Sequence, residues 1–196
     1  MTSLGVVVEA SRSATRRHST NSMAYEHYLL GRHHYVRDTS ADLEKAREHF
    51  EAAIRLDDTY ALAYSGLAET YALLGSYDVM PIGTSHPLGR KAAERALQLD
   101  DTLAEAHRAL AQILADHYWE WEEAERHHRR ALDLAPEDAT TLRMYSFYLA
   151  YTGRAIEAIP MAEKARMTKM TKRADPRVLT FDCAYTFAGS TSGRNQ

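Results

Sequence analysis

Residues 53–58 read Ala-Ile-Arg-Leu-Asp-Asp, and this short stretch returns twice along the chain. Residues 96–101 read Ala-Leu-Gln-Leu-Asp-Asp, and residues 131–136 read Ala-Leu-Asp-Leu-Ala-Pro. The first alanines of the three stretches lie 43 and then 35 residues apart. Recurrence at such a period is typical of a solenoid of stacked helical units, in which no unit buries its apolar face alone. The stretch therefore predicts an all-α repeat protein that holds a partner.

The bulk composition excludes several classes of protein. The chain has 196 residues, of which 45% are hydrophobic and 26% charged, and a net charge of −3. This charge gives no basis for binding nucleic acid or an anionic membrane, so neither is expected as a partner. Cys183 is the only cysteine, which rules out an internal disulfide. No apolar run approaches the ~20 residues of a membrane-spanning helix, and residues 5–8 are too short for a signal-peptide core. We expect a cytoplasmic protein.

The helical period divides the chain into an array and two ends. Residues 1–22 carry Arg, Ser and Thr without a helical period and are predicted to be a disordered leader or linker, with an organelle-targeting segment as the alternative. Residues 169–196 are predicted to be an irregular tail with a partial helix over 176–188. The array covers residues 23–168, with approximate repeats over 23–58, 59–101, 102–136 and 137–168.

Several helix ends have local signals. Asn21 or Ser22 is suited to cap the first helix, and the spacing from Thr102 to Glu105 is that of a capping box. Gly75 is suited to a left-handed turn at the end of a helix. These signals predict helix starts near residues 23 and 103 and a helix end near residue 75.

Two stretches depart from the regular pattern. Residues 76–87 form the longest break, and their glycine and two prolines predict an irregular excursion before a helix that starts near Leu88. This excursion is either a tolerated insertion or a contact lip over a groove. Trp119 and Trp121 stand at a predicted turn between two helices, where packing in the turn is expected and stacking on a nucleic-acid base is the alternative.

The predicted helices repeat one spacing of small and large residues. The second helices place such residues four and then three positions apart, at Ala46/Phe50/Ala53, Gly89/Ala93/Ala96, Ala124/His128/Ala131 and Ala158/Ala162/Ala165. The first helices carry Leu30-Gly31, Leu67-Ala68, Leu110-Ala111 and Tyr145-Ser146 at matching places. Small residues let neighbouring helices approach closely. These motifs resemble those of tetratricopeptide repeat (TPR) proteins over residues 23–168. The resemblance implies a right-handed superhelical solenoid of about four helix-turn-helix repeats.

One phrase narrows the resemblance. Residues 24–32 (Ala-Tyr-Glu-His-Tyr-Leu-Leu-Gly-Arg), with residues 60–68 after them, are similar to the TPR region of bacterial nucleotide cyclases, Ser/Thr kinases and winged-helix transcriptional regulators. The chain itself contains no Gly-rich phosphate loop, no kinase signature set and no cyclase-sized α/β region. We therefore expect no enzyme activity and no cofactor. The chain is either a fragment of such a protein or a short stand-alone relative.

The resemblance also implies a binding surface, because the first helix of each TPR pair lines a concave groove. The residues that it places along this groove are Tyr25, Tyr28, Arg32, Tyr35, Ser65, Glu69, Glu105, Arg108, Gln112, Asp116, Arg143, Phe147 and Tyr151. Exposed Tyr and Arg side chains give much of the binding energy of interfaces. For the tyrosines, packing between helices is the alternative. The Lys and Asn residues with which some TPR proteins grip a C-terminal carboxylate have no counterpart here.

Metal binding and catalysis find little support. The chain has 10 histidines, but the adjacent pairs His33–His34 and His127–His128 point about 100° apart on a helix and do not chelate together. His128 stands where TPR proteins prefer Phe and is interpreted as a packing residue. Cys183 lies in the irregular C-terminal segment without a convincing His/Asp relay, so a nucleophilic role is not expected. The Asp pairs of the repeated stretch are interpreted as helix caps. We expect no catalytic and no metal-binding residues.

These observations favour a protein–protein interaction module that presents a concave groove to a peptide or protein. The resemblance suggests the regulatory or scaffold part of a bacterial signalling or transcription-control protein. Two alternatives stay open. The apolar face of residues 155–167 has no polar cap, so a second copy could cover it in a homo-oligomer, unless residues 176–188 fold back on it. The chain could also be a fragment of a larger enzyme, such as a nucleotide cyclase or kinase.

Overall fold

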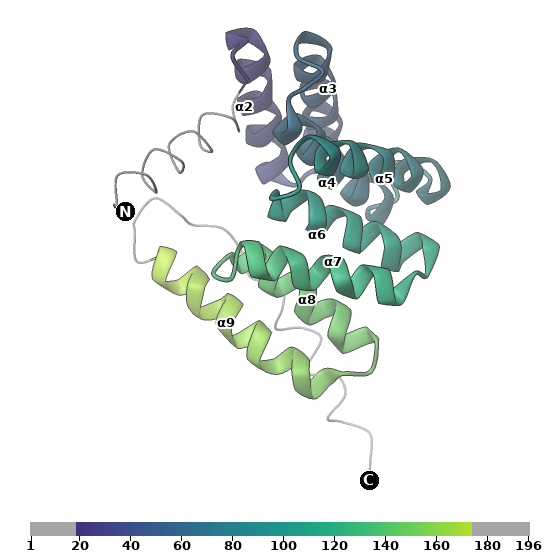
Figure 1. Cartoon of the computed structure of the whole chain (residues 1–196), viewed down its shortest axis with the longest axis vertical. Coiled ribbons are helices and arrows are strands. Elements are labelled where there is room, and N and C mark those ends of the chain that lie inside the picture. The colour runs from purple at the N-terminus through teal and green to yellow at the C-terminus, as the bar shows by residue number, and fades with distance from the viewer. Residues whose placement is uncertain (1–18, 174–196) are drawn as a thin grey trace, which may run out of the picture.

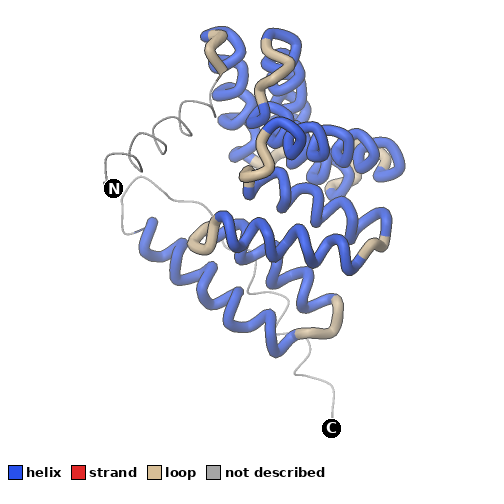
Figure 2. The backbone as a smooth tube through the Cα atoms, in the orientation of Figure 1, coloured by secondary structure: helices blue, strands red, loops and turns tan. Residues whose placement is uncertain are grey.

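The computed structural model describes residues 19–173, and eight α-helices and one short π-helix make up nearly all of this range. No strand occurs within it (Figure 2), so the all-α prediction is confirmed. The predicted leader, except its last residues, and the predicted partial helix over 176–188 lie outside the described residues. The helices are α2 (Ser22–Arg37), α3 (Ser40–Leu56), α4 (Ala61–Ser76), α5 (Ile82–Leu99), α6 (Ala104–Ile113), η1 (the π-helix, Leu114–Tyr118), α7 (Trp121–Leu134), α8 (Ala139–Tyr151) and α9 (Ala155–Arg173).

The helices form four hairpins that stack in chain order. The pairs are α2 with α3, α4 with α5, α6 with α7 and α8 with α9, and each pair contacts the next (Figure 1). One hydrophobic core runs through the stack from α3 to α9. Many of its members are alanines, because small side chains let the helices approach closely. This is the TPR-type solenoid of four helix-turn-helix units that the sequence predicts.

Phe50 anchors the first two hairpins. Its side chain is fully buried and lies against Gly31 of α2 and Gly66 of α4. A methyl group added at Gly31 would lie 2.8 Å from the Phe50 ring, and one added at Gly66 would lie 2.5 Å from it. Both distances are shorter than van der Waals contact, so the two glycines make room for the ring. The closely packed core therefore fixes the identities of three residues on three different helices.

His128 has the packing role that the sequence predicts. Its ring is 1% exposed and lies between two tyrosines of α8, with ring centroids 5.5 Å from Tyr145 and 5.0 Å from Tyr148. Its Nδ1 atom has no hydrogen-bond partner in the part of the chain that the structure describes. Burial lowers the pKa of His128 to about 3, so the ring is neutral and acts as an aromatic packing group.

The helix-end predictions have mixed outcomes. Asn21 caps α2 by accepting hydrogen bonds from the backbone N–H groups of Met23 and Ala24, as expected. The capping box at Thr102 is wrong, because the Thr102 hydroxyl donates to Asp100 instead and α6 starts without a side-chain cap. The left-handed turn at Gly75 is also wrong. Gly75 lies inside α4, where a methyl group would collide with residues 85 and 86 of α5.

The predicted excursion over 76–87 is shorter than expected. Helix α5 begins at Ile82, so only residues 77–81 lie between the two helices, and Pro87 lies inside α5. Pro87 has no N–H, so the carbonyl of Gly83 lacks its helical hydrogen-bond donor. Both residues are exposed, and water can donate a hydrogen bond to that carbonyl instead. The buried residues Ser85, His86 and Gly89 belong to the face that this helix packs against its neighbours. Tertiary packing therefore outweighs the helix-breaking signal.

The tryptophan turn is built around the π-helix η1. Trp119 follows η1 with φ of 60°, in the left-handed region, and its side chain is 71% exposed. The expectation that both tryptophans pack in the turn is therefore wrong for Trp119. Trp121 is 39% exposed and lies against Tyr148, with ring centroids 6.4 Å apart, so it is only partly packed.

Helix α9 continues to Arg173, which adds residues 169–173 to the helical array. These residues belong to the stretch that the sequence assigns to the tail. Within residues 19–173, no helix has a run both long and apolar enough to cross a membrane.

The packing around Phe50 gives a stability prediction. Replacing Gly66 by Ala should lower the free energy of unfolding by about 2 kcal/mol, because the added methyl group overpacks the core against the ring. The measurement is urea unfolding followed by circular dichroism. Gly83→Ala is the matched control, because nothing lies within 4 Å of a methyl group there, and it should stabilise the protein by up to about 1 kcal/mol through helix propensity. Equal urea midpoints for the two variants would contradict the packing argument.

Candidate functional site

The first helices of the four hairpins line one face of the solenoid. Helices α2 and α4, α4 and α6, and α6 and α8 are in contact, whereas successive second helices make at most a weaker contact in the described range. The first helices therefore lie on the inner side of the stack. We call this surface the inner face. All predicted groove residues stand on these helices or on η1, which continues α6: Tyr25, Tyr28, Arg32 and Tyr35 on α2, Ser65 and Glu69 on α4, Glu105, Arg108 and Gln112 on α6, Asp116 on η1, and Arg143, Phe147 and Tyr151 on α8.

A buried network of charges crosses the inner face at Glu69. One carboxylate oxygen of Glu69 accepts a hydrogen bond from Arg32 of α2 at 2.8 Å, and the other accepts from Arg108 of α6. Arg108 also donates to Asp138 at 3.1 Å and to the hydroxyl of Thr141 at 3.0 Å. Asp138 is the N-cap of α8 and accepts from the backbone N–H of Thr141 at 2.7 Å. We call these five residues the Glu69 network, and they connect all four first helices.

Burial and charge act in opposite directions on the arginines of the Glu69 network. The side chain of Arg108 is 9% exposed and that of Glu69 is 3% exposed. Burial is the largest single influence and would lower the pKa of Arg108, but the charge and hydrogen bond of Glu69 together with Tyr35 and Asp138 outweigh it, and the pKa is raised. The same balance raises the pKa of Arg32. Both arginines are therefore permanently charged, and removal of Glu69 would leave two cations without their main partner.

The predicted groove residues divide into buried and exposed groups. Ser65, Glu69 and Arg108 are buried in the wall of the inner face. Tyr28 is half-buried and packs on Phe50 and Tyr60, with ring centroids 6.0 and 5.2 Å away. For these residues the structure shows a packing role, in line with the alternative that the sequence leaves open for the tyrosines.

The remaining groove residues have solvent-facing surface. Arg32 is half-buried, and its guanidinium lies 4.9 Å from the centre of the Tyr35 ring. Arg143 is exposed and lies 5.6 Å from the centre of the Phe147 ring, which is 38% exposed. The others with accessible surface are Tyr25, Glu105, Gln112, Asp116 and Tyr151. The inner face thus carries cationic and aromatic side chains along α2 and α8, with mixed polar residues between them.

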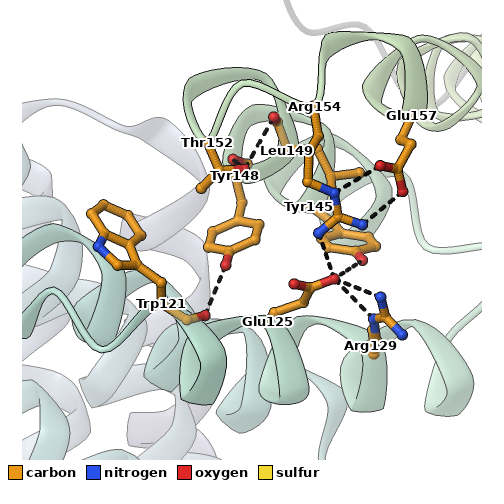
Figure 3. Close-up of polar contacts among 9 residues, drawn as sticks. All are labelled: Trp121, Glu125, Arg129, Tyr145, Tyr148, Leu149, Thr152, Arg154 and Glu157. Carbon is orange, nitrogen blue, oxygen red and sulfur yellow. Dashed lines mark hydrogen bonds and ion pairs between the residues drawn. The ribbon is translucent and has the colours of Figure 1, made fainter.

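A second polar cluster holds the last hairpin in place. Figure 3 shows Glu125 of α7 accepting hydrogen bonds from Tyr145 at 3.2 Å, from Arg154 at 2.7 Å and from Arg129 at 2.6 Å. Arg154 also binds both carboxylate oxygens of Glu157, at 2.7 and 2.6 Å. The hydrogen bond from Arg154, with the help of Arg129, lowers the pKa of Glu125. The cluster therefore connects α7 with both helices of the last hairpin.

The contact of a tyrosine and an arginine with one glutamate recurs earlier in the array. The Tyr71 hydroxyl donates to Glu51 at 3.1 Å, and Arg47 pairs with the same carboxylate at 3.0 Å. In both places the glutamate lies on a second helix, 20 residues before a tyrosine on the next first helix. The repeated contact ties one hairpin to the next.

Histidines meet in pairs between helices. The Nδ1 atoms of His107 and His127 lie 2.8 Å apart, and those of His27 and His49 lie 3.1 Å apart. Spacing along the sequence does not reveal these pairs, because their members belong to different helices. No group of three or more His, Cys, Asp or Glu side chains within residues 19–173 is placed to hold a metal ion.

Two members of the Glu69 network are absent from the predicted groove residues. The spacing of Asp138 and Thr141 is that of an N-cap, which the sequence alone could indicate. Their contact with Arg108 crosses about 30 residues and arises only when α6 and α8 lie side by side. The Asp138 carboxylate thus both caps a helix and neutralises an arginine.

The Glu69 network gives a second stability prediction. Glu69→Gln should lower the free energy of unfolding by about 3 kcal/mol, because it leaves Arg32 without its ion pair and leaves the buried Arg108 with the Asp138 carboxylate alone. The measurement is urea unfolding at pH 7. Glu137→Gln, which breaks the exposed pair with Lys164, is the matched control and should change stability by less than about 0.5 kcal/mol.

A double variant separates charge from packing. Glu69→Gln/Arg32→Gln should recover part of the lost stability, because it removes the cation that keeps no ion pair within residues 19–173 once Glu69 is neutral. If the second substitution lowered the free energy of unfolding in the Glu69→Gln background as much as it does alone, the two sites would be independent and the charge argument would be refuted.

Comparison with known proteins identifies the fold. No family model matches the chain, and no curated protein matches it either. Among solved structures, TTC0263, described as a thermophilic TPR protein in Thermus thermophilus, superposes with a TM-score of 0.64 at 19% identity, over 79% of this chain and 77% of that one. MamA superposes with a TM-score of 0.52 at 18% identity, over 77% of this chain and 81% of that one. The chain therefore has the fold of the TPR proteins.

Proposed function

We propose that the chain is a protein–protein interaction module that presents its inner face to a peptide or protein. The fold supports this, because a stack of hairpins forms an extended surface without needing a catalytic centre. The residue types support it too, since aromatic and arginine side chains supply most of the binding energy at protein interfaces. No catalytic role is proposed for any residue.

The observation that carries the proposal is the division of the inner face into a fixed frame and exposed anchors. The Glu69 network holds the four first helices in register through buried contacts. Arg143, Phe147 and Tyr25 project from the same helices with substantial solvent exposure. A surface that is already ordered loses less conformational freedom when a partner binds. The frame thus prepares the anchors for binding.

The biological setting is proposed from the sequence phrase at residues 24–32. Its similarity to repeat regions of bacterial signalling and transcription-control proteins favours a cytoplasmic regulatory or scaffold role. In that setting the chain would bring a partner to a catalytic or DNA-binding module, which could belong to the same polypeptide or to another one.

A paired substitution tests the inner face. Arg143→Glu/Phe147→Ala should lower the affinity for a partner captured from the source cells by at least about tenfold, because it reverses one anchor charge and removes one anchor ring. The partner is identified by mass spectrometry and its affinity measured with purified proteins. Lys91→Glu, an exposed change on α5 of the outer layer, is the control and should bind like the wild type. Equal affinities for all three proteins would refute the inner face as the binding surface.

Self-association is a second candidate function, and one observation favours it. Ile156 is 86% exposed and Ile159 is 57% exposed, both on α9 at the end of the stack. Exposed apolar side chains on a terminal repeat are a surface that another copy could cover.

The oligomeric state tests this candidate. Sedimentation equilibrium of the wild type should show a dimer that Ile156→Glu/Ile159→Glu shifts to monomer, because two buried charges would oppose the contact. A wild type that stays monomeric at millimolar concentration would rule out self-association.

A further inference from the structure

Both tryptophans of the chain gather at one corner of the solenoid, next to the end of α8. Trp119 lies two residues before α7, Trp121 is the first residue of α7, and Tyr151 is the last residue of α8. The Trp121 ring lies 6.0 Å from that of Trp119 and 6.3 Å from that of Tyr151, and both pairs meet edge to face. We call Trp119, Trp121 and Tyr151, together with the carboxylate of Asp116, the tryptophan corner.

The exposure of the tryptophan corner has no explanation in the packing of the fold. Trp119 is 71% exposed, Tyr151 55% and Trp121 39%. Trp119 also holds a left-handed backbone conformation, which is costly for a large side chain and is not offset by burial of its ring. Such strain, next to a π-helix, is typical of positions kept for a function.

The rings are held in position from below. The Tyr148 hydroxyl donates a hydrogen bond to the backbone carbonyl of Trp121 at 2.7 Å, which fixes the start of α7 against α8 (Figure 3). In the same view the Trp121 indole points away from the Glu125 cluster. The backbone that carries Trp121 is therefore fixed against α8, while the Trp121 side chain keeps exposed surface.

An acidic rim borders these rings. The Tyr151 hydroxyl donates to the Asp116 carboxylate at 3.5 Å, and no ion pair involves Asp116 anywhere in residues 19–173. Desolvation raises the pKa of Asp116, although hydrogen bonds from Gln112 and Tyr151 act in the opposite direction. Glu122, the next residue after Trp121, is exposed, and Glu120 is half-buried and forms an ion pair with Arg90 at 3.0 Å. The corner thus combines aromatic faces with excess negative charge.

We propose that the tryptophan corner binds an arginine side chain on a basic segment of a partner protein. A guanidinium lies favourably on the face of an indole, and its planar donors suit a carboxylate such as Asp116. The negative rim opposes phosphates, so stacking on a nucleic-acid base is disfavoured. Because Asp116 and Tyr151 also belong to the inner face, the corner extends that face by a subsite with its own charge preference. The inference rests on the proposed function only in taking the partner to be a protein.

The two tryptophans provide a direct probe, because the chain contains no others. We would titrate the full chain with a hexapeptide of alternating glycine and arginine and follow tryptophan fluorescence and calorimetry. Saturable binding is expected, with a glycine–serine peptide giving none and a glycine–lysine peptide binding more weakly. Trp119→Ala, a change at an exposed side chain, should weaken binding about fivefold by calorimetry.

The charge is tested with a matched pair of variants. Asp116→Asn keeps the shape of the side chain and should weaken binding about tenfold. Glu44→Gln removes the same charge from an exposed position on α3, near the other end of the solenoid, and should leave binding within twofold of the wild type. Equal losses for the two variants would show non-specific attraction and overturn the proposal.

Three further results would also overturn it. They are the absence of saturable binding, equal affinity for the lysine peptide, and a dimer of the wild type that Trp119→Ala abolishes. The failure of the corner would be distinct from a failure of the inner face. Suppose that Arg143→Glu/Phe147→Ala no longer bound the captured partner, but the arginine peptide did not bind the wild type. The inner face would then be supported as a binding surface, and the arginine site at the tryptophan corner would be refuted.

Discussion

A carboxylate that cannot reach water must be paired, and Glu69 meets this constraint with two arginines from two neighbouring hairpins. Arg32 precedes it by one hairpin and Arg108 follows it by one, and Arg108 passes the connection on to Asp138 at the start of α8. A shift of any first helix along its axis would separate one of these pairs and leave a buried charge alone. The alanines of the core allow the helices to come close, and Phe50 anchors the first two hairpins, but the alanines by themselves specify the register of the helices weakly. The register of the inner face therefore depends on this charge network.

The sequence predicts the fold because the relevant signals are local. The alanines and large apolar residues of each second helix recur within one or two turns, so their spacing fixes both the helices and the faces that they bury. The role of Arg108 could not be predicted in the same way. Its partners lie 39 and 30 residues away, and the spacing of residues within one helix cannot tell which carboxylate an arginine will meet. The same limit explains why an arginine placed in the groove by resemblance is found buried in its wall.

The two intervals between the repeated stretches correspond to different local structures. The 43-residue interval indicates added chain, and the prolines suggest that it forms a loop. Part of it is instead accommodated by helix, because α5 has 18 residues where α7 has 14, and only residues 77–81 remain between α4 and α5. The 35-residue interval exceeds the TPR period of about 34 by roughly one residue. A π-helix takes up an added residue without breaking the helix that contains it, and η1 lies within this interval.

The location of η1 suggests why so small an insertion matters. In a solenoid each unit contacts only its neighbours, so a change at one turn alters the local surface and leaves the rest of the stack in place. Here the wider turn ends in a left-handed residue that directs Trp119 into solvent, while Trp121 and Tyr148 keep α7 and α8 together beneath it. The Glu69 network lies on the inner face and does not include the residues of this turn. The frame of the array and the tryptophan corner can therefore vary separately, and a residue added at the turn changes what the solenoid displays without changing how it folds.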